Sequence, residues 1–79
     1  MNPKPIAVEP LEDFRLLLTF TGGVRKVFDM KPWLDRSTFQ RLNDKGFFLL
    51  VKVDGGCVYW NEDIDMCPDV LYLGSVDAE

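Results

Sequence analysis

The clearest regularity along the chain is an alternation of apolar and polar positions in its first third. Every second position there is apolar, as in a strand with one buried face: Phe14, Leu16, Leu18 and Phe20. Thr21-Gly22-Gly23 supplies the positive φ angles that a tight reversal needs, and Val24–Phe28 returns as a partner strand. The pattern therefore predicts a β-hairpin over residues 14–29. Ile6–Leu11 reads as an earlier strand, which Pro10 restricts to an edge or a strand end.

The middle of the chain predicts one helix. Ser37 and Gln40 have the spacing of a capping box, in which each side chain satisfies a free backbone donor. A helix of about two turns is therefore expected from Thr38 to about Asp44, and Gly46 is expected to end it in the left-handed conformation. Two apolar residues three positions apart mark its buried side: Phe39 and Leu42.

The last third predicts a second hairpin. Phe47–Val53 is apolar and rich in strand formers, and Asp54-Gly55-Gly56 is a turn signal that leads into a strand at Cys57–Trp60. Ile64–Met66 is expected to form a last short extended segment. Pro68 suits the first position of a helix of no more than one turn.

These elements predict a single domain over residues 1–79 with an ordered core of about residues 6–75 and frayed ends. The expected fold class is α+β: a small antiparallel sheet of four to five short strands with one helix packed on one face. No apolar run approaches the roughly 20 residues of a membrane span, and the opening residues lack the apolar stretch of a signal peptide. A cytoplasmic location is therefore expected.

Charge and composition narrow the function classes. Residues 1–52 carry a net charge of +3 and residues 53–79 a net charge of −7, which leaves the chain at −4. Nucleic-acid binding by this domain is not expected, because such domains are usually positive. The absence of histidine removes the usual general base and every Ser-His or Cys-His nucleophile pair. We therefore expect no catalytic residues and no cofactor.

The segment "WNEDIDMCPD", residues 60–69, concentrates four carboxylates. Its oxygen-bearing side chains fall at positions one, three, five and nine of a calcium-loop template: Asn61, Asp63, Asp65 and Asp69. Met66 replaces the required glycine and Tyr72 the bidentate glutamate, so no metal site is expected. The preferred interpretation is a solvated rim of the fold in which Asp65 or Asp69 caps the helical turn at Pro68.

The two cysteines, Cys57 and Cys67, are expected to be reduced and buried as small apolar residues, because the cytosol keeps thiols reduced. A tetrahedral zinc site would need two carboxylates beside them, an uncommon ligand set. The aromatic residues are expected to lie mostly in the core, Trp33 among them, while Trp60 is left open between core and surface. Four residues are the candidate interaction residues: Trp60, Asp65, Asp69 and Tyr72.

Three stretches carry a resemblance to a known family: "VEPLEDFRLLLTFTGGV", "VFDMKPWLD" and "VDGGCVYWNEDIDMCPDVLYLGS". From about Ile6 to Ser75 the chain resembles a bacterial family known as domain of unknown function 2442. The resemblance implies a small cytoplasmic α+β domain without established activity, and it assigns no catalytic residue. Some relatives look like fusions to a helix-turn-helix DNA-binding domain. Others are encoded beside a second small protein, in an arrangement similar to toxin and antitoxin pairs.

Two hypotheses of function follow. The first is a non-enzymatic interaction or regulatory module, an antitoxin-like partner that binds another small protein through an exposed sheet edge or aromatic patch. Homo-oligomerisation through an unpaired strand belongs to the same hypothesis. The second is a metal- or small-ligand-binding domain that uses the acidic segment, with Asp63, Asp65 and Asp69 as ligands and Cys67 beside them.

Overall fold

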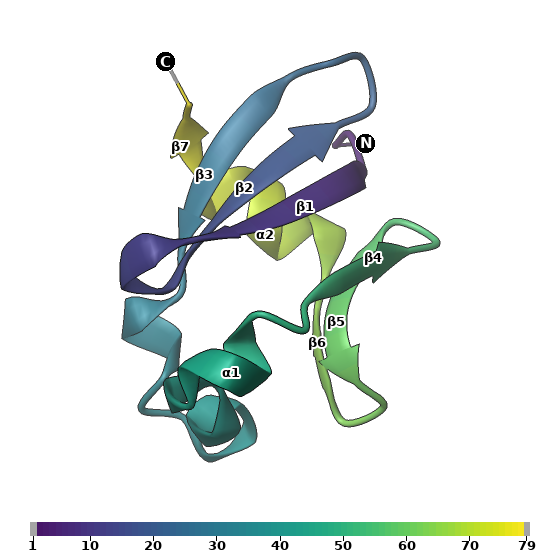
Figure 1. The fold of residues 1–79 in the computed structure, drawn as a ribbon. Helices are drawn as coiled ribbons and strands as arrows, with labels where there is room; N and C mark the ends of the chain where they lie inside the picture. Colours follow the sequence, from purple (N-terminus) through teal and green to yellow (C-terminus); the bar gives the residue numbers. More distant parts are fainter. Residues whose placement is uncertain (1, 79) are drawn as a thin grey trace.

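The first sheet is built on the hairpin that the apolar alternation predicts. The structure is a computed structural model that describes residues 2–78. β2 (Arg15–Phe20) and β3 (Arg25–Asp29) form the hairpin, and β1 (Pro5–Leu11) pairs with β2 on its other side. These pairings are antiparallel, and the turn glycines Gly22 and Gly23 have φ angles of 90° and 88°. The predicted hairpin and first strand are both confirmed (Figure 1).

A second sheet contains β4 (Lys52–Asp54), β5 (Cys57–Asn61) and β6 (Ile64–Met66), all antiparallel, in the order β4-β5-β6. The predicted second hairpin and the last extended segment are confirmed. The α+β class is confirmed as well, but the strands form two sheets, of four and three strands, where one sheet was expected.

The expected strand at residues 47–53 is wrong except for its last two residues. Those residues begin in α1 (Lys45–Phe48), and only Lys52 and Val53 join a strand, β4. The side chain of Asp44 accepts a hydrogen bond from the Gly46 amide at 3.0 Å and starts α1, so Gly46 lies inside a helix and does not end one. Short apolar runs fit a buried strand and a buried helical turn equally well, which explains the error.

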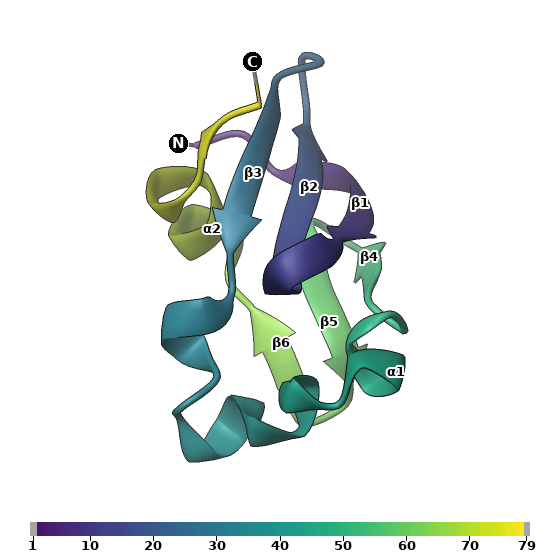
Figure 2. The ribbon, with the colours of Figure 1, turned by 60° about the vertical axis from the view of Figure 1, so that its left-hand side comes forward.

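The predicted helix at residues 38–44 is instead a 3-10 helix, η3 (Ser37–Asn43), which follows another short one, η2 (Lys31–Trp33). The expected capping box does not form, because Arg36 is the N-cap residue and no side chain caps the helix. Phe39 and Leu42 are buried, as their spacing predicts. These segments lie at the end of the molecule away from the β2–β3 turn (Figures 1 and 2).

The C-terminal region is more ordered than expected. α2 (Pro68–Gly74) has seven residues, not a single turn, and Cys67 is its N-cap without a side-chain hydrogen bond. The prediction that Asp65 or Asp69 caps this helix is therefore wrong. The predicted fraying after residue 74 is also wrong in part, because β7 (Val76–Asp77) pairs with β3 and completes the order β1-β2-β3-β7. Glu79 lies outside the described residues.

The hydrophobic core lies between the two sheets. Each β2 residue that points inward is fully buried, and the inward residues of β5 and β6 are buried as well. The cluster combines both sheets with η3, α1 and α2: Leu16, Leu18, Phe20, Phe28, Met30, Leu34, Phe39, Leu42, Phe48, Val58, Trp60, Ile64, Met66 and Leu71. β1 contacts both β4 and β5, so the two sheets meet along it. Over residues 2–78, no helix combines the length and apolar character needed to cross a membrane.

Candidate interaction surface

Trp60, the first of the candidate interaction residues, belongs to the core. The residue is 5% exposed, and the centroid of its ring lies 6.1 Å from that of Phe48. The indole Nε1–H donates a hydrogen bond of 2.9 Å to the Phe48 carbonyl oxygen. A tryptophan buried and satisfied in this way is not available as a surface anchor, and the open choice between core and surface is settled in favour of the core.

The other three candidate residues lie on different elements. Asp65 is exposed on β6, opposite Tyr59 of β5. Asp69 is exposed in the first turn of α2 and accepts a hydrogen bond of 3.4 Å from Asn2. Tyr72 is half-buried and fixes α2 to the first sheet, because its ring contacts Phe20 edge to face at a centroid distance of 5.2 Å. Within residues 2–78 no hydrogen bond or ion pair joins the four candidate side chains to one another.

The acidic segment forms a side-chain-capped turn between β5 and β6. Asn61 Oδ1 accepts hydrogen bonds from the amides of Asp63 and Ile64, both at 2.9 Å, so this oxygen shapes the turn. In the part of the chain that the structure describes, no three Cys, Asp or Glu side chains are grouped so that they could hold a metal ion. A shallow hollow of about 510 Å³ lies beside the turn and is lined by Lys52, Tyr59, Trp60, Asn61, Glu62 and Asp63.

A second, more enclosed and more apolar hollow lies where η1 (Glu12–Phe14) meets α1. We call it the η1–α1 groove; its volume is about 370 Å³, and it is lined by Pro10, Leu11, Glu12, Asp13, Phe14, Lys45, Phe48 and Leu49. The rings of Phe14 and Phe48 meet edge to face at 5.3 Å. Leu49 is 60% exposed, and the adjacent Leu50 is 55% exposed. The groove is therefore a solvent-exposed apolar surface whose lining also includes two acidic residues and one basic residue.

The backbone that forms one side of the groove is strained. Asp13 has φ 61° and ψ 32°, and Phe14 has φ 57°. This left-handed region costs about 1–2 kcal/mol for an L-residue and is an outlier for a side chain as bulky as phenylalanine. Strain of this kind persists only where the surrounding structure holds it, and it clusters at functional sites.

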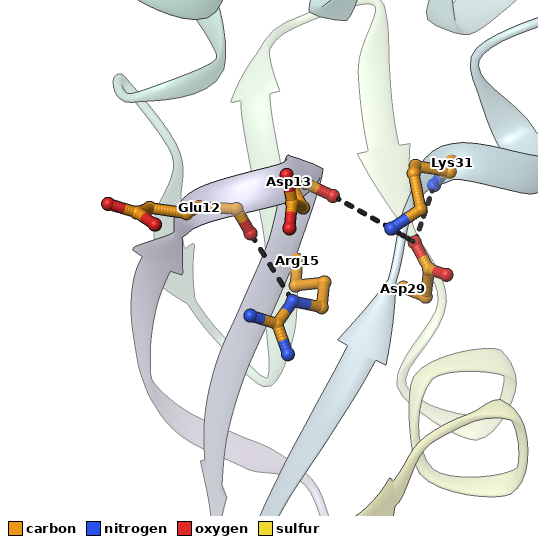
Figure 3. Close-up of polar contacts among 5 residues, drawn as sticks. All are labelled: Glu12, Asp13, Arg15, Asp29 and Lys31. Carbon is orange, nitrogen blue, oxygen red and sulfur yellow. Dashed lines mark hydrogen bonds and ion pairs between the residues drawn. The ribbon is translucent and has the colours of Figure 1, made fainter.

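Hydrogen bonds to the backbone of η1 hold the strained turn in place. Lys31 Nζ donates to the Asp13 carbonyl oxygen at 3.3 Å, and Arg15 Nε donates to the Glu12 carbonyl oxygen at 3.3 Å (Figure 3). Asp29 orients the lysine, because its carboxylate accepts from the Lys31 amide at 2.9 Å and lies 3.6 Å from Lys31 Nζ. The groove wall is thus supported by the first residue of β2, the last residue of β3 and the first residue of η2.

Replacing Asp13 with glycine is expected to raise the free energy of unfolding by about 0.5–1 kcal/mol, because glycine adopts the observed φ of 61° without the steric cost of a Cβ. Glycine also gains more entropy on unfolding, and that gain offsets part of the relief. Urea unfolding followed by circular dichroism measures the change. Glu12→Gly is the matched control: it removes a carboxylate from the same turn where φ is not positive, and it should lower stability. Equal effects of the two variants would show that strain at Asp13 is not the cause.

Sequence reasoning missed this groove. Its signal is the run "FFLL" at residues 47–50, which is too apolar for a single buried face. Phe48 is buried, while Leu49 and Leu50 are exposed, because a helical turn distributes neighbouring side chains around its axis. Residues 47–53 are expected from the sequence to form a strand, and that expectation gives no indication of two exposed leucines after a helical turn.

Comparison with known proteins finds one family. The model described as "Protein of unknown function (DUF2442)" matches residues 5–77, nearly the whole chain. Neither the curated proteins nor the solved structures include a match. The match covers both sheets, both α-helices and the η1–α1 groove.

Proposed function

The chain belongs to the DUF2442 family, a family of unknown function, and on that premise we propose that it is a non-enzymatic, cytoplasmic interaction module. It binds a second small protein, as an antitoxin-like partner does, and the η1–α1 groove is its binding surface. The observation that carries the proposal is the exposed Leu49 beside an aromatic groove whose wall is a strained turn.

The energetics of Leu49 favour a partner on this surface. Full burial of a leucine side chain contributes about 1.5–3 kcal/mol relative to exposure, and Leu49 is still 60% exposed. Single exposed apolar residues are ordinary, but here two neighbouring leucines adjoin a groove whose lining includes Phe14 and Phe48. Anchors that fill an apolar pocket beside aromatic side chains supply most of the binding energy in protein interfaces.

The chemistry of the groove defines the partner. Its apolar lining fits an apolar side chain from an amphipathic helix, the mode in which a helix places one face in a hydrophobic groove. Glu12 and Asp13 among the lining residues favour a basic residue beside that anchor, because opposite charges steer encounter and fix orientation. The partner segment is therefore an amphipathic helix with a basic edge.

The test uses the purified full chain and the small protein encoded by the neighbouring gene. The two should copurify, and titration calorimetry should give a defined dissociation constant. Leu49→Asp is expected to weaken binding at least tenfold, about 1.4 kcal/mol, because it places a charge in the apolar contact. Since Leu49 is exposed, the free energy of unfolding should change by less than about 0.5 kcal/mol.

Leu73→Asp is the matched control. Leu73 is 73% exposed on α2 and does not line the groove, so the same chemical change should leave the dissociation constant unaltered. The proposed surface is wrong if Leu73→Asp weakens binding as much as Leu49→Asp does. The proposed function is wrong if the two proteins do not associate at all.

A further inference from the structure

Cys57 is the first residue of β5, and Cys67 follows directly after the last residue of β6. Val58 of β5 pairs with Met66 of β6, and Tyr59 pairs with Asp65. In an antiparallel ladder the next pair along is Cys57 with Cys67, and the backbone of Cys67 is extended, with φ −70° and ψ 143°. Extended by one residue, the register therefore brings Cys67 opposite Cys57 at the end of the β5–β6 ladder.

Side-chain burial independently supports this placement. Val58 and Met66 are buried, while their chain neighbours at the end of the ladder, Cys57 and Cys67, are exposed. Successive side chains on a strand point to opposite faces, so both thiols are on the outer, solvent-facing side of the second sheet. The expectation that the cysteines are buried as small apolar residues is wrong for both, and both are unpaired in the structure.

The geometry of opposite positions suits a disulfide. Opposite Cα atoms of antiparallel strands are about 4.5 or 5.5 Å apart, depending on whether the pair exchanges hydrogen bonds. A disulfide requires about 4.4–6.8 Å between its Cα atoms, so either type of pair falls in the range. Two exposed thiols in this arrangement have both the access and the separation that intramolecular oxidation needs.

We propose that Cys57 and Cys67 form a thiol–disulfide exchange site whose oxidant is a small-molecule disulfide of the glutathione class. One protein thiolate attacks a sulfur of that disulfide, breaks its S–S bond and releases one small thiol, leaving a mixed disulfide on the protein. The second protein thiolate attacks the protein sulfur of the mixed disulfide and releases the second small thiol. The protein loses two hydrogen atoms, and the small disulfide is reduced to two thiols.

The bond would fasten α2 to the second sheet. Cys67 is the N-cap residue of α2, and Cys57 is the first residue of β5, so the disulfide closes a loop that contains the whole β5–β6 turn. A closed loop has fewer unfolded conformations, which raises the melting temperature by on the order of 10 °C for a loop and domain of this size. This inference does not depend on the proposed partner or on the η1–α1 groove, because none of its residues lines that groove.

The experiment treats the dilute, purified full chain with oxidised glutathione and measures intact mass. The expected product is a monomer lighter by two hydrogen atoms, with no thiol left to react with maleimide, and excess dithiothreitol should restore the original mass. Scanning calorimetry of the oxidised and reduced forms should show the rise in melting temperature. Cys57→Ser and Cys67→Ser should each stop at one glutathione adduct.

A register control separates the proposed geometry from mere exposure of two thiols. Cys67→Ser combined with Asp65→Cys keeps two thiols on the outer face, but now in diagonal positions about 7–8 Å apart, too far for an unstrained disulfide. This variant should accumulate two glutathione adducts. The proposal is overturned if the wild-type chain ends with two adducts or as a disulfide-linked dimer. Equally rapid internal crosslinking of the register control would also overturn it.

Discussion

Trp60→Ala is expected to lower the free energy of unfolding by about 3–5 kcal/mol, the range for loss of a buried aromatic side chain. A domain of this length has a total stability of roughly 4–12 kcal/mol, so the variant should be largely unfolded at moderate temperature. The size of the effect follows from burial to 5% exposure and from the 2.9 Å bond to the Phe48 carbonyl. Urea unfolding followed by far-ultraviolet circular dichroism measures the change.

Trp60→Phe separates the contribution of ring burial from that of the indole hydrogen bond. It keeps an aromatic ring in the core but removes the 2.9 Å bond from the indole, so the Phe48 carbonyl oxygen keeps only the longer bond of 3.4 Å from the Val51 amide. Loss of one such hydrogen bond costs about 0.5–1.5 kcal/mol. The ring change also removes volume, so the loss should lie between zero and that of Trp60→Ala. A loss below about 1 kcal/mol for Trp60→Ala would contradict the assignment of Trp60 to the core.

Gly74→Ala is expected to lower the free energy of unfolding by about 2 kcal/mol, although it replaces glycine with the best helix former. A Cβ at position 74 would lie 2.9 Å from Cε1 of Phe28, whose ring is buried and cannot move freely. Overpacking of this kind costs typically 1–3 kcal/mol, while the gain in helix propensity is about 1 kcal/mol at most and smaller at the last residue of α2. Thermal unfolding of the purified variant measures the balance.

Gly46→Ala is the control for Gly74→Ala. Gly46 is also helical, in α1, but its added Cβ would meet only the flexible Asp44 side chain, at 3.4 Å. Propensity should dominate there, so stability should be unchanged or rise by up to about 1 kcal/mol. Stabilisation by both variants would mean that the Phe28 ring moves to make room for the new methyl group. The claim that α2 packs closely on β3 would then be wrong.

The two hairpins could be predicted because their signals are local. The period of two in β2 and the glycine pairs after β2 and β4 each depend on a few neighbouring residues. Alternation reports which face is buried, and adjacent glycines supply positive φ angles at low cost. The same reasoning located β6 and the start of α2 at Pro68.

Two of the errors fall where distant contacts override local preference. β7 has only two residues and is held by its pairing with Lys26 and Val27, about fifty positions earlier. Nothing in its own polar sequence indicates a strand, so fraying was the reasonable prediction. η3 likewise keeps its buried residues while losing its predicted cap, because burial of Phe39 and Leu42 decides its position.

The candidate surface also depends on contacts between residues far apart in the chain and not on a local sequence signal. Leu11 and Phe14 come from the first fifth of the chain, while Phe48 and Leu49 come from beyond its middle. Their approach depends on how the two sheets meet along β1, a contact that no local pattern encodes. Sequence reasoning could judge residue type at Trp60 but not whether the ring faced solvent, because tryptophan occurs both in cores and at interfaces.

The order of apolar and polar residues determined by itself that this chain forms short strands, tight glycine turns and an α+β domain, because backbone period and turn geometry depend on adjacent residues. Only the tertiary structure decided that the strands divide into two sheets, that Leu49 is left exposed beside a strained turn and that Val58 pairs with Met66 in the β5–β6 register. These three outcomes depend on contacts between residues far apart in the chain, or on a strand register that the sequence pattern leaves open.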